Sequence, residues 1–310
     1  MLFRSTYLGV RKIISPSSTD GNVYDSTLYV DEDVVSQVEL HGGSGDDLFF
    51  VDGGSATAIN DVEGGDGNDN VVVGGSRPGR RFLIVGGNGT NELDGGPGDD
   101  EIVGGPGVNF MIGGDGADMF RTDGGTNYII GDDGSMMMPW MVTATPGFPL
   151  APRMTTSGSA SGNDVIQATS GTNYILAGLG NDTINGGGRN TVVADEGTLW
   201  FSTRGGISRV SSQPSRIDFF TGDSAQQSFT LNGVPLDSTL TAAMDHTALN
   251  SSAFTLTGNV ISLPQPLASG VQLAVSYSVA NSGTGGDDTI SGDSGFEAVV
   301  AGARSEEHTS

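Results

Sequence analysis

Cysteine is absent from the 310 residues, and basic residues are scarce: 13 Lys and Arg stand against 37 Asp and Glu, for a formal net charge of −24. Without Cys there are no disulfides or thiolate metal sites, so a stabilising metal must be bound by oxygen ligands, which favour Ca²⁺ or Mg²⁺. Nucleic acids and anionic membranes attract basic surfaces. The acidity therefore excludes both as expected partners and favours cations.

Long apolar runs and catalytic motifs are also lacking. No apolar run reaches the ~18 residues that span a bilayer, so we expect no membrane span. The start, MLFRSTYLGVRKII, lacks a continuous apolar core with a small-residue cleavage site, and we expect no cleaved signal peptide. His41 and His246 fall in no metal-ligand spacing, and no nucleophile-elbow or phosphate-loop motif occurs. These absences predict that the chain is not an enzyme.

Glycine is abundant, at 51 residues, and it recurs with a period. Residues Gly86–Arg121 read GGNGTNELD, GGPGDDEIV, GGPGVNFMI and GGDGADMFR, four tandem nine-residue units. This resembles the G-G-x-G-x-D-x-U-x nonapeptide of the RTX (hemolysin-type) calcium-binding family, in which U is a large apolar residue. The resemblance covers about two-thirds of the chain with its looser copies. It implies an all-β fold, a right-handed parallel β-roll, with Ca²⁺ as cofactor and secretion through a type I system to the extracellular space.

The spacing of each unit has a physical interpretation. Glycines at positions one, two and four permit tight turns whose carbonyl oxygens point inward. Position six supplies a carboxylate, and the last three residues form a short strand whose U residue faces the interior. Two units make one coil, so neighbouring turns are about two repeats apart in sequence. The predicted U residues are Phe49, Ile59, Val71, Leu83, Leu93, Ile102, Met111, Phe120, Ile129, Ile166, Ile175, Ile184, Val192, Ile290 and Val299.

Alternate units lie on opposite edges of such a roll, and the position-six residues differ between the edges. One edge carries Asp47, Asp69, Asn91, Asn109, Asn127, Asn173, Asn190 and Glu297. The other carries Thr57, Arg81, Asp100, Asp118, Asp164, Asp182 and Asp288. We expect strong Ca²⁺ sites between Asp100 and Asp118 and between Asp164 and Asp182, a third at Asp47 and Asp69, and Asp288 as a further ligand. The Asn edge predicts neutral side-chain ladders, and Arg81 predicts a turn without metal.

Two insertions interrupt the repeats, and each leaves and re-enters at the Asp edge, which predicts one interrupted solenoid. The first is rich in Met and Pro, and two interpretations are a partner-binding loop or a segment covering the roll edge. The second has period-two alternation with turn signals, which predicts a small antiparallel β module. Its role is either to bind a protein or glycan ligand or to act as a spacer.

The chain is thereby divided into seven segments. They are an N-terminal cap at 1–41 with His41 as a cap residue, β-roll at 42–134, the Met/Pro-rich loop at 135–160, β-roll at 161–197, the β module at 198–282, β-roll at 283–303, and a tail at 304–310. The tail resembles translated sequencing adapter, so we expect the natural chain to continue beyond Ala303. Removing its one positive and two negative charges leaves −24 + 1 = −23.

Three functions remain open from the sequence. The first is a structural, calcium-folded segment of a secreted adhesive or surface protein. The second is the calcium-binding repeat region of a larger exported enzyme, such as a protease, lipase or epimerase, whose catalytic domain lies elsewhere. The third is a metal-independent β-solenoid with decayed motifs, supported by the Asn edge.

Overall fold

The computed structural model describes residues 11–14, 38–51, 59–74, 79–138, 152–157, 162–202, 206–236, 240–245, 247–280, 286–292, 296–300 and 307–309. These residues form β-strands and one short 3₁₀ turn, η1 (Ser251–Ala253). None of the helical structure among them could cross a membrane. The described part of the chain divides into two compact units, one made of residues 1–134, 158–196 and 283–310 and the other of residues 135–157 and 197–282.

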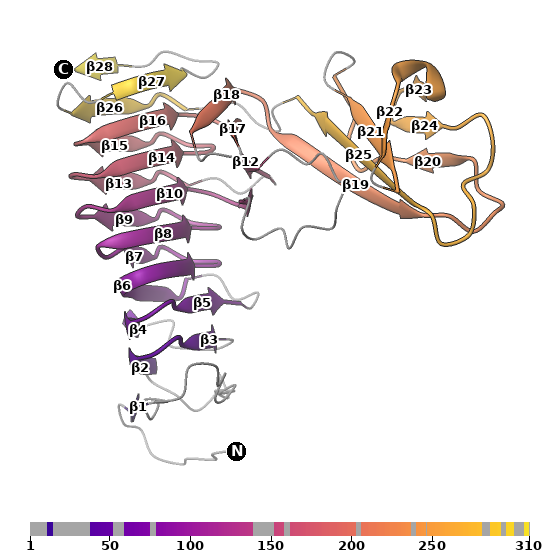
Figure 1. Ribbon diagram of the computed structural model, residues 1–310. Helices are drawn as coiled ribbons and strands as arrows, with labels where there is room; N and C mark the ends of the chain where they lie inside the picture. Colours follow the sequence, from indigo (N-terminus) through magenta and orange to yellow (C-terminus); the bar gives the residue numbers. More distant parts are fainter. Residues whose placement is uncertain are drawn as a thin grey trace. The chain divides into compact units, whose positions relative to one another are not determined.

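The first unit is a parallel β-roll with two walls (Figure 1). One wall contains β1 (Arg11–Ile14), β2 (Val38–Ser44), β4 (Ile59–Asp66), the start of β6 (Arg81–Asp94), β7 (Glu101–Val103), β9 (Met119–Thr122), β13 (Val165–Ala168), β15 (Thr183–Gly186), β26 (Thr289–Gly292) and β28 (Glu307–Thr309). The other contains β3 (Leu48–Val51), β5 (Asn70–Val73), the end of β6, β8 (Gly107–Ile112), β10 (Thr126–Ile130), β14 (Thr172–Leu176), β16 (Arg189–Val193) and β27 (Phe296–Val300). The chain alternates between the walls, so each coil adds one strand to both.

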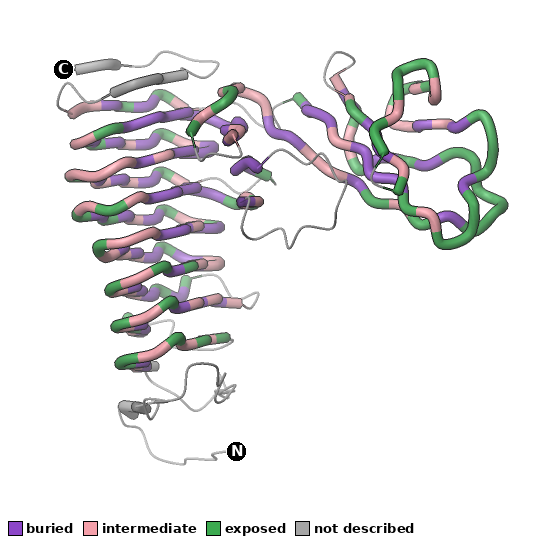
Figure 2. The backbone as a smooth tube through the Cα atoms, in the orientation of Figure 1, coloured by how far each residue is buried: buried purple, intermediate pink, exposed green. Residues whose placement is uncertain are grey.

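The roll's interior is a thin apolar column, one side chain deep on each wall. Ile84, Ile102 and Phe120 are in register on one wall, and each is at most 1% exposed. Figure 2 shows buried stretches recurring on each coil. Tight turns close the coils: Gly116 has a φ of +135°, and a Cβ there would collide with the carbonyl of Gly98. Only glycine fits such a position without strain.

The prediction of an interior position is wrong for two residues, Ile59 and Leu83, and both lie in the irregular N-terminal coils. Strand pairing aligns Val62 with Ile84 and Ile84 with Ile102. Val62 and Ile84 are fully buried, whereas Ile59 is 51% exposed and Leu83 is only partly buried. These coils have 22 residues in place of 18, and the extra residues of the turn displaced the count along the chain.

The roll also begins earlier than predicted, because β2 includes residues 38–41 that were assigned to the cap. Within 1–37 only β1 is described, paired in parallel with β2. Residues 304–310, the predicted adapter tail, include β28, whose backbone pairs with β26.

The second unit contains three small antiparallel sheets. They are β11 (Gly134–Met137), β12 (Arg153–Thr156), β17 (Thr198–Phe201) and β18 (Ile207–Ser211); β19 (Ser215–Thr221), β25 (Gln272–Ser278), β21 (Thr241–Met244) and β22 (Thr247–Leu249); and β20 (Ser228–Thr230), β24 (Val260–Ser262) and β23 (Thr255–Thr257). The antiparallel module is thereby confirmed. Its core includes Phe229, Ile261, Leu273, Val275 and Tyr277.

The described part of the first insertion belongs to the same unit as the second. Arg153 pairs with Trp200 and Thr155 with Thr198 across β12 and β17, so residues 153–156 form a strand where a loop was expected. Met138 is buried. Trp140, Met141, Phe148 and Leu150 lie outside the described residues.

Candidate metal-binding turns

The position-six aspartates of one edge form a continuous ladder through the roll. The backbone N–H of Asp100 donates to Oδ1 of Asp118 at 2.7 Å. The same contact, at 2.8 Å, joins Asp118 to Asp164, Asp164 to Asp182 and Asp182 to Asp288. The ladder crosses both insertions, and it holds one oxygen of each carboxylate in a fixed direction.

The second oxygen of these carboxylates is buried and accepts no hydrogen bond from the described residues. This holds for Oδ2 of Asp100, Asp118, Asp164 and Asp182, whose side chains are about 1% exposed. Leaving a buried charge without a counter-charge is among the costliest arrangements in a protein. A row of such oxygens indicates a missing positive partner.

Burial also makes these carboxylates poor acids while no cation is present. Loss of hydration raises the pKa of Asp100 to about 7 and of Asp118 to about 9, with repulsion from neighbouring carboxylates adding to the rise. The same cause raises the pKa of Asp164 and of Asp182 to about 8. A proton or a metal ion can supply the missing charge, and at neutral pH the two compete.

A backbone carbonyl lies beside the second carboxylate oxygen of Asp100, Asp118 and Asp164. At Gly95 a Cβ would lie 2.9 Å from Oδ2 of Asp100 and 2.7 Å from the carbonyl oxygen of Gly113 in the next turn. Gly113 is crowded in the same way by Asp118 and by the carbonyl of Gly131. Carboxylate and carbonyl oxygens are the ligands that Ca²⁺ prefers. Each of these turns fits a calcium ion held by turn carbonyls and by ladder carboxylates, which are those of Asp100, Asp118, Asp164, Asp182 and Asp288.

The opposite edge satisfies itself without a cation. Nδ2 of Asn109 donates to Oδ1 of Asn127 at 2.9 Å and to the carbonyl of Gly105 at 2.8 Å. Matching amide contacts join the remaining members, Asn91 to Asn109, Asn127 to Asn173 and Asn173 to Asn190. The amide NH₂ therefore donates to groups that would otherwise require a cation. This is the neutral ladder predicted for the Asn edge.

The N-terminal end of the Asn edge changes character. The N–H of Asp47 donates to Oδ1 of Asp69 at 2.9 Å, and the N–H of Asp69 donates to Oδ1 of Asn91 at 3.1 Å. Oδ2 of both aspartates is buried without a donor. Burial raises the pKa of Asp69 to about 6. Asp47 and Asp69 thus present the same arrangement as the Asp ladder, over two turns.

Arg81 does not occupy the ladder position assigned to it, because the register places Phe82 there: its N–H donates to Oδ1 of Asp100 at 2.7 Å. Arg81 is exposed and donates to the carbonyl of Asp99. The buried cation of that turn is Arg80, 2% exposed, whose Nη2 lies 3.4 Å from the carbonyl oxygen of Gly74. Thr57 lies outside the described residues, as does the side chain of Glu297.

Among the buried acids that the repeat pattern missed are Asp132 and Asp195, which are 3% and 1% exposed. Each follows the first residue of a turn from which an insertion departs, where the motif has glycine. An acid in place of the second glycine was the available signal. Among the described residues no three acidic or histidine side chains already converge as a metal cluster, so an ion in these turns must also use backbone carbonyls.

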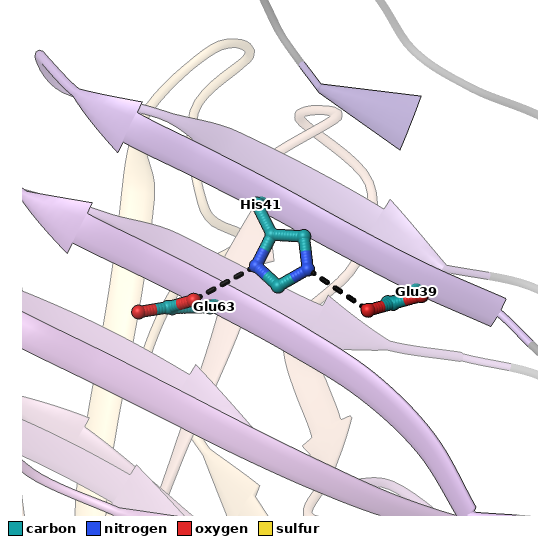
Figure 3. A network of polar contacts seen from close by, with 3 residues as sticks. All are labelled: Glu39, His41 and Glu63. Carbon is teal, nitrogen blue, oxygen red and sulfur yellow. Dashed lines mark hydrogen bonds and ion pairs between the residues drawn. The ribbon is translucent and has the colours of Figure 1, made fainter. Parts of the chain in front are cut away.

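His41, predicted to be a cap residue, lies in β2 on the outer face of the roll. Its Nδ1 lies 2.8 Å from Oε2 of Glu63, and its Nε2 lies 3.3 Å from Oε1 of Glu39 (Figure 3). Glu63 is the cross-strand neighbour of His41 on β4. This cluster is a surface contact between strands, separate from the turns.

The model of the RTX calcium-binding nonapeptide repeat matches residues 39–58, 85–120, 103–135, 159–197 and 282–296. The matched segments of the roll carry RTX calcium-binding repeats, and the roll is called the RTX array below. The matched segments of this RTX array contain six of the seven predicted ligands, and Asp69 falls between two of them. RTX repeats imply calcium binding. No curated protein matches the chain.

Proposed function

We propose that the RTX array binds calcium chiefly along its Asp edge and that calcium binding folds it. The observation that supports this is the row of buried aspartates with one oxygen bonded to the adjacent turn and the other without a donor. The Asn edge, built on the same backbone, lacks that deficit. The lack of a donor therefore comes from the aspartate side chains, since the backbone is the same at both edges.

Coupling of calcium binding to folding follows from the composition. A net charge of −24 and 51 glycines favour an expanded chain, through charge repulsion and backbone entropy. The apolar column is thin and offers limited compensation. Calcium supplies positive charge between adjacent turns, and its binding energy becomes folding energy.

Secretion of a structural or adhesive segment is the proposed setting. Extracellular calcium modules bind with Kd values of roughly 10⁻⁴ to 10⁻³ M, so such an array would remain unfolded in the cytosol and fold outside the cell. RTX repeat proteins are typically exported by type I systems. The antiparallel unit supports an adhesive role if it binds a protein or glycan ligand. Its alternative role is that of a spacer.

We propose that this chain has no catalytic activity of its own. Its buried carboxylates recur with the repeat, whereas an acid and base pair needs two groups in different environments. The alternative is the calcium-binding region of a larger exported protease, lipase or epimerase. The complete open reading frame distinguishes these two settings.

A calcium titration followed by circular dichroism tests the central proposal. The β signal of the chelated protein should be limited to the contribution of the antiparallel unit and should rise cooperatively with added Ca²⁺. A β signal already complete in EDTA would favour the metal-independent solenoid, which the self-satisfied Asn ladder supports. Mg²⁺ at the same concentration serves as the control cation, because it demands a smaller and more rigid octahedral site.

A further inference from the structure

The first insertion leaves the roll at Gly131-Asp132, within a turn of the Asp edge. The N–H of Gly113 donates to the carbonyl of Ile130, and the N–H of Gly131 donates to the carbonyl of Leu176. This pairing aligns Gly131 with Gly113 and Ala177. Asp132 therefore occupies the place that Gly114 and Gly178 hold in the adjacent turns.

Asp132 points into the stack of turns. Its Oδ2 accepts the N–H of Leu179, and a Cβ on Gly178 would collide with the same carboxylate. Its Oδ1 is buried and accepts no hydrogen bond of ordinary geometry, although the N–H of Gly162 lies close enough to the carboxylate to lower its pKa, and the side chain is 3% exposed. Asp164 and Asp182 are close enough for their charges to interact with that of Asp132. Asp132 thus places a buried oxygen within electrostatic reach of two ladder carboxylates.

We infer that Asp132 is an additional calcium ligand at the junction of the first insertion, supplementing the ladder carboxylates and turn carbonyls that bind the ion there. The inference rests on the proposed calcium binding by the Asp edge. A turn interrupted by an insertion loses the continuous glycine loop whose carbonyls face the ion. The carboxylate of Asp132 replaces that lost oxygen, and its charge raises the affinity of the junction above that of the other turns.

The second insertion shows the same substitution. The N–H of Ala177 donates to the carbonyl of Val193 at 3.0 Å, which aligns Ala194 with Ala177 and Asp195 with Gly178. Asp195 is 1% exposed, and its charge acts on Asp182. Both points of departure therefore place a buried acid at the second position of the turn. Because a buried acid occurs at this position in both junctions, as Asp132 and as Asp195, we associate it with the departure of an insertion.

Asp132→Asn tests the inference, with Asp133→Asn as the matched control. Asn keeps the shape and an oxygen that can accept the Leu179 N–H, and it removes the charge. Asp133 is adjacent and exposed, so its substitution makes the same change in net charge at a side chain that faces solvent. Isothermal titration of each full-length protein with Ca²⁺ measures the affinity of the tightest sites. Circular dichroism at saturating Ca²⁺ verifies that each variant folds.

Asp132→Asn should weaken the tightest calcium-binding phase by roughly tenfold, while Asp133→Asn should change it by less than about twofold. Equal affinities in the two variants would overturn the role of Asp132 while leaving calcium binding by the ladder intact. Absence of Ca²⁺ binding in the unsubstituted protein would instead refute the proposed function. If Asp132→Asn does not fold, Asp132→Gly restores the ordinary turn residue, and the same loss of affinity is expected from it.

Discussion

The backbone N–H of Asp118 donates to Oδ1 of Asp164 at 2.8 Å, although 46 positions separate the two residues. The bond has the same form as that between Asp164 and Asp182, which are 18 positions apart. The ladder therefore continues across the first insertion without a change of geometry. Its functional consequences can be tested one residue at a time.

The two edges should respond differently to removal of a ladder side chain. Asp118→Ala deletes a carboxylate and should weaken calcium affinity by roughly tenfold or more. Asn109→Ala deletes a neutral amide that is equally buried. It should lower the stability of the roll, because the hydrogen bonds of the amide to Asn127 and Gly105 are lost. It should have little effect on calcium affinity, because no metal ligand is removed. Calcium titration calorimetry measures both effects. Equal losses of affinity would refute the assignment of metal to the Asp edge.

Without calcium, the roll should be favoured by acid. The folded-state pKa values of about 7 to 9 for Asp100, Asp118, Asp164 and Asp182 exceed the ordinary value of 3.8. The folded chain therefore binds more protons than the unfolded chain between about pH 4 and pH 9, and its stability falls as the pH rises through that window. In EDTA, the β signal should grow as the pH is lowered from 8 to 5. A signal that grows with rising pH would contradict this.

The register of the N-terminal coils predicts which of two adjacent residues supports the core. Ile84→Ala should destabilise the calcium-saturated roll by about 2–5 kcal/mol, because it leaves a cavity in the interior. Leu83→Ala, on the outer face, should cost about 1 kcal/mol or less. Urea unfolding at saturating Ca²⁺ compares the two. The reverse order would restore the register first expected from the sequence.

Removal of calcium should affect the two units unequally. The antiparallel unit has its own apolar core, and Tyr277 donates to Oδ2 of Asp218 at 2.6 Å within it. Nothing in that core depends on a row of like charges, so EDTA should leave its amides protected. Hydrogen exchange read by mass spectrometry should show fast exchange in the roll strands and slow exchange in β19 and β25. Simultaneous loss of protection in both units would contradict this.

The sequence predicted the regular part of the roll well, because a strict nine-residue period places glycines, acids and apolar residues independently of the remainder of the fold. The separation into Asp and Asn edges followed from alternation alone, and the register bears it out from Asn91 to Asn190. The coils before Gly86 were harder. There the turn is longer, and only hydrogen bonding between neighbouring coils decides whether Leu83 or Ile84 faces inward.

The partnership between the insertions could not be predicted in this way. Strand β12 joins β17 through backbone hydrogen bonds between segments about 45 positions apart, and period-two alternation carries no information about such a partner. Asp132 and Asp195 were missed for a related reason. The repeat motif has glycine at position two, so an acid at that position was interpreted as a departure from the motif. The burial of Asp132 and Asp195 shows that these acids are part of the turn.

The ladder also determines where foreign sequence can enter this protein. Neighbouring rungs are joined at 2.7 to 2.8 Å whether 18, 46 or 106 positions separate them. Closing a loop of 106 rather than 18 residues costs only about 1.6 kcal/mol more in chain entropy. An Asp-edge turn can therefore accept an insertion. The hydrogen bond between neighbouring aspartates fixes the register in which the chain returns, and its geometry does not depend on the length of the insertion. We expect that different modules can be exchanged at such a turn while the roll keeps its register.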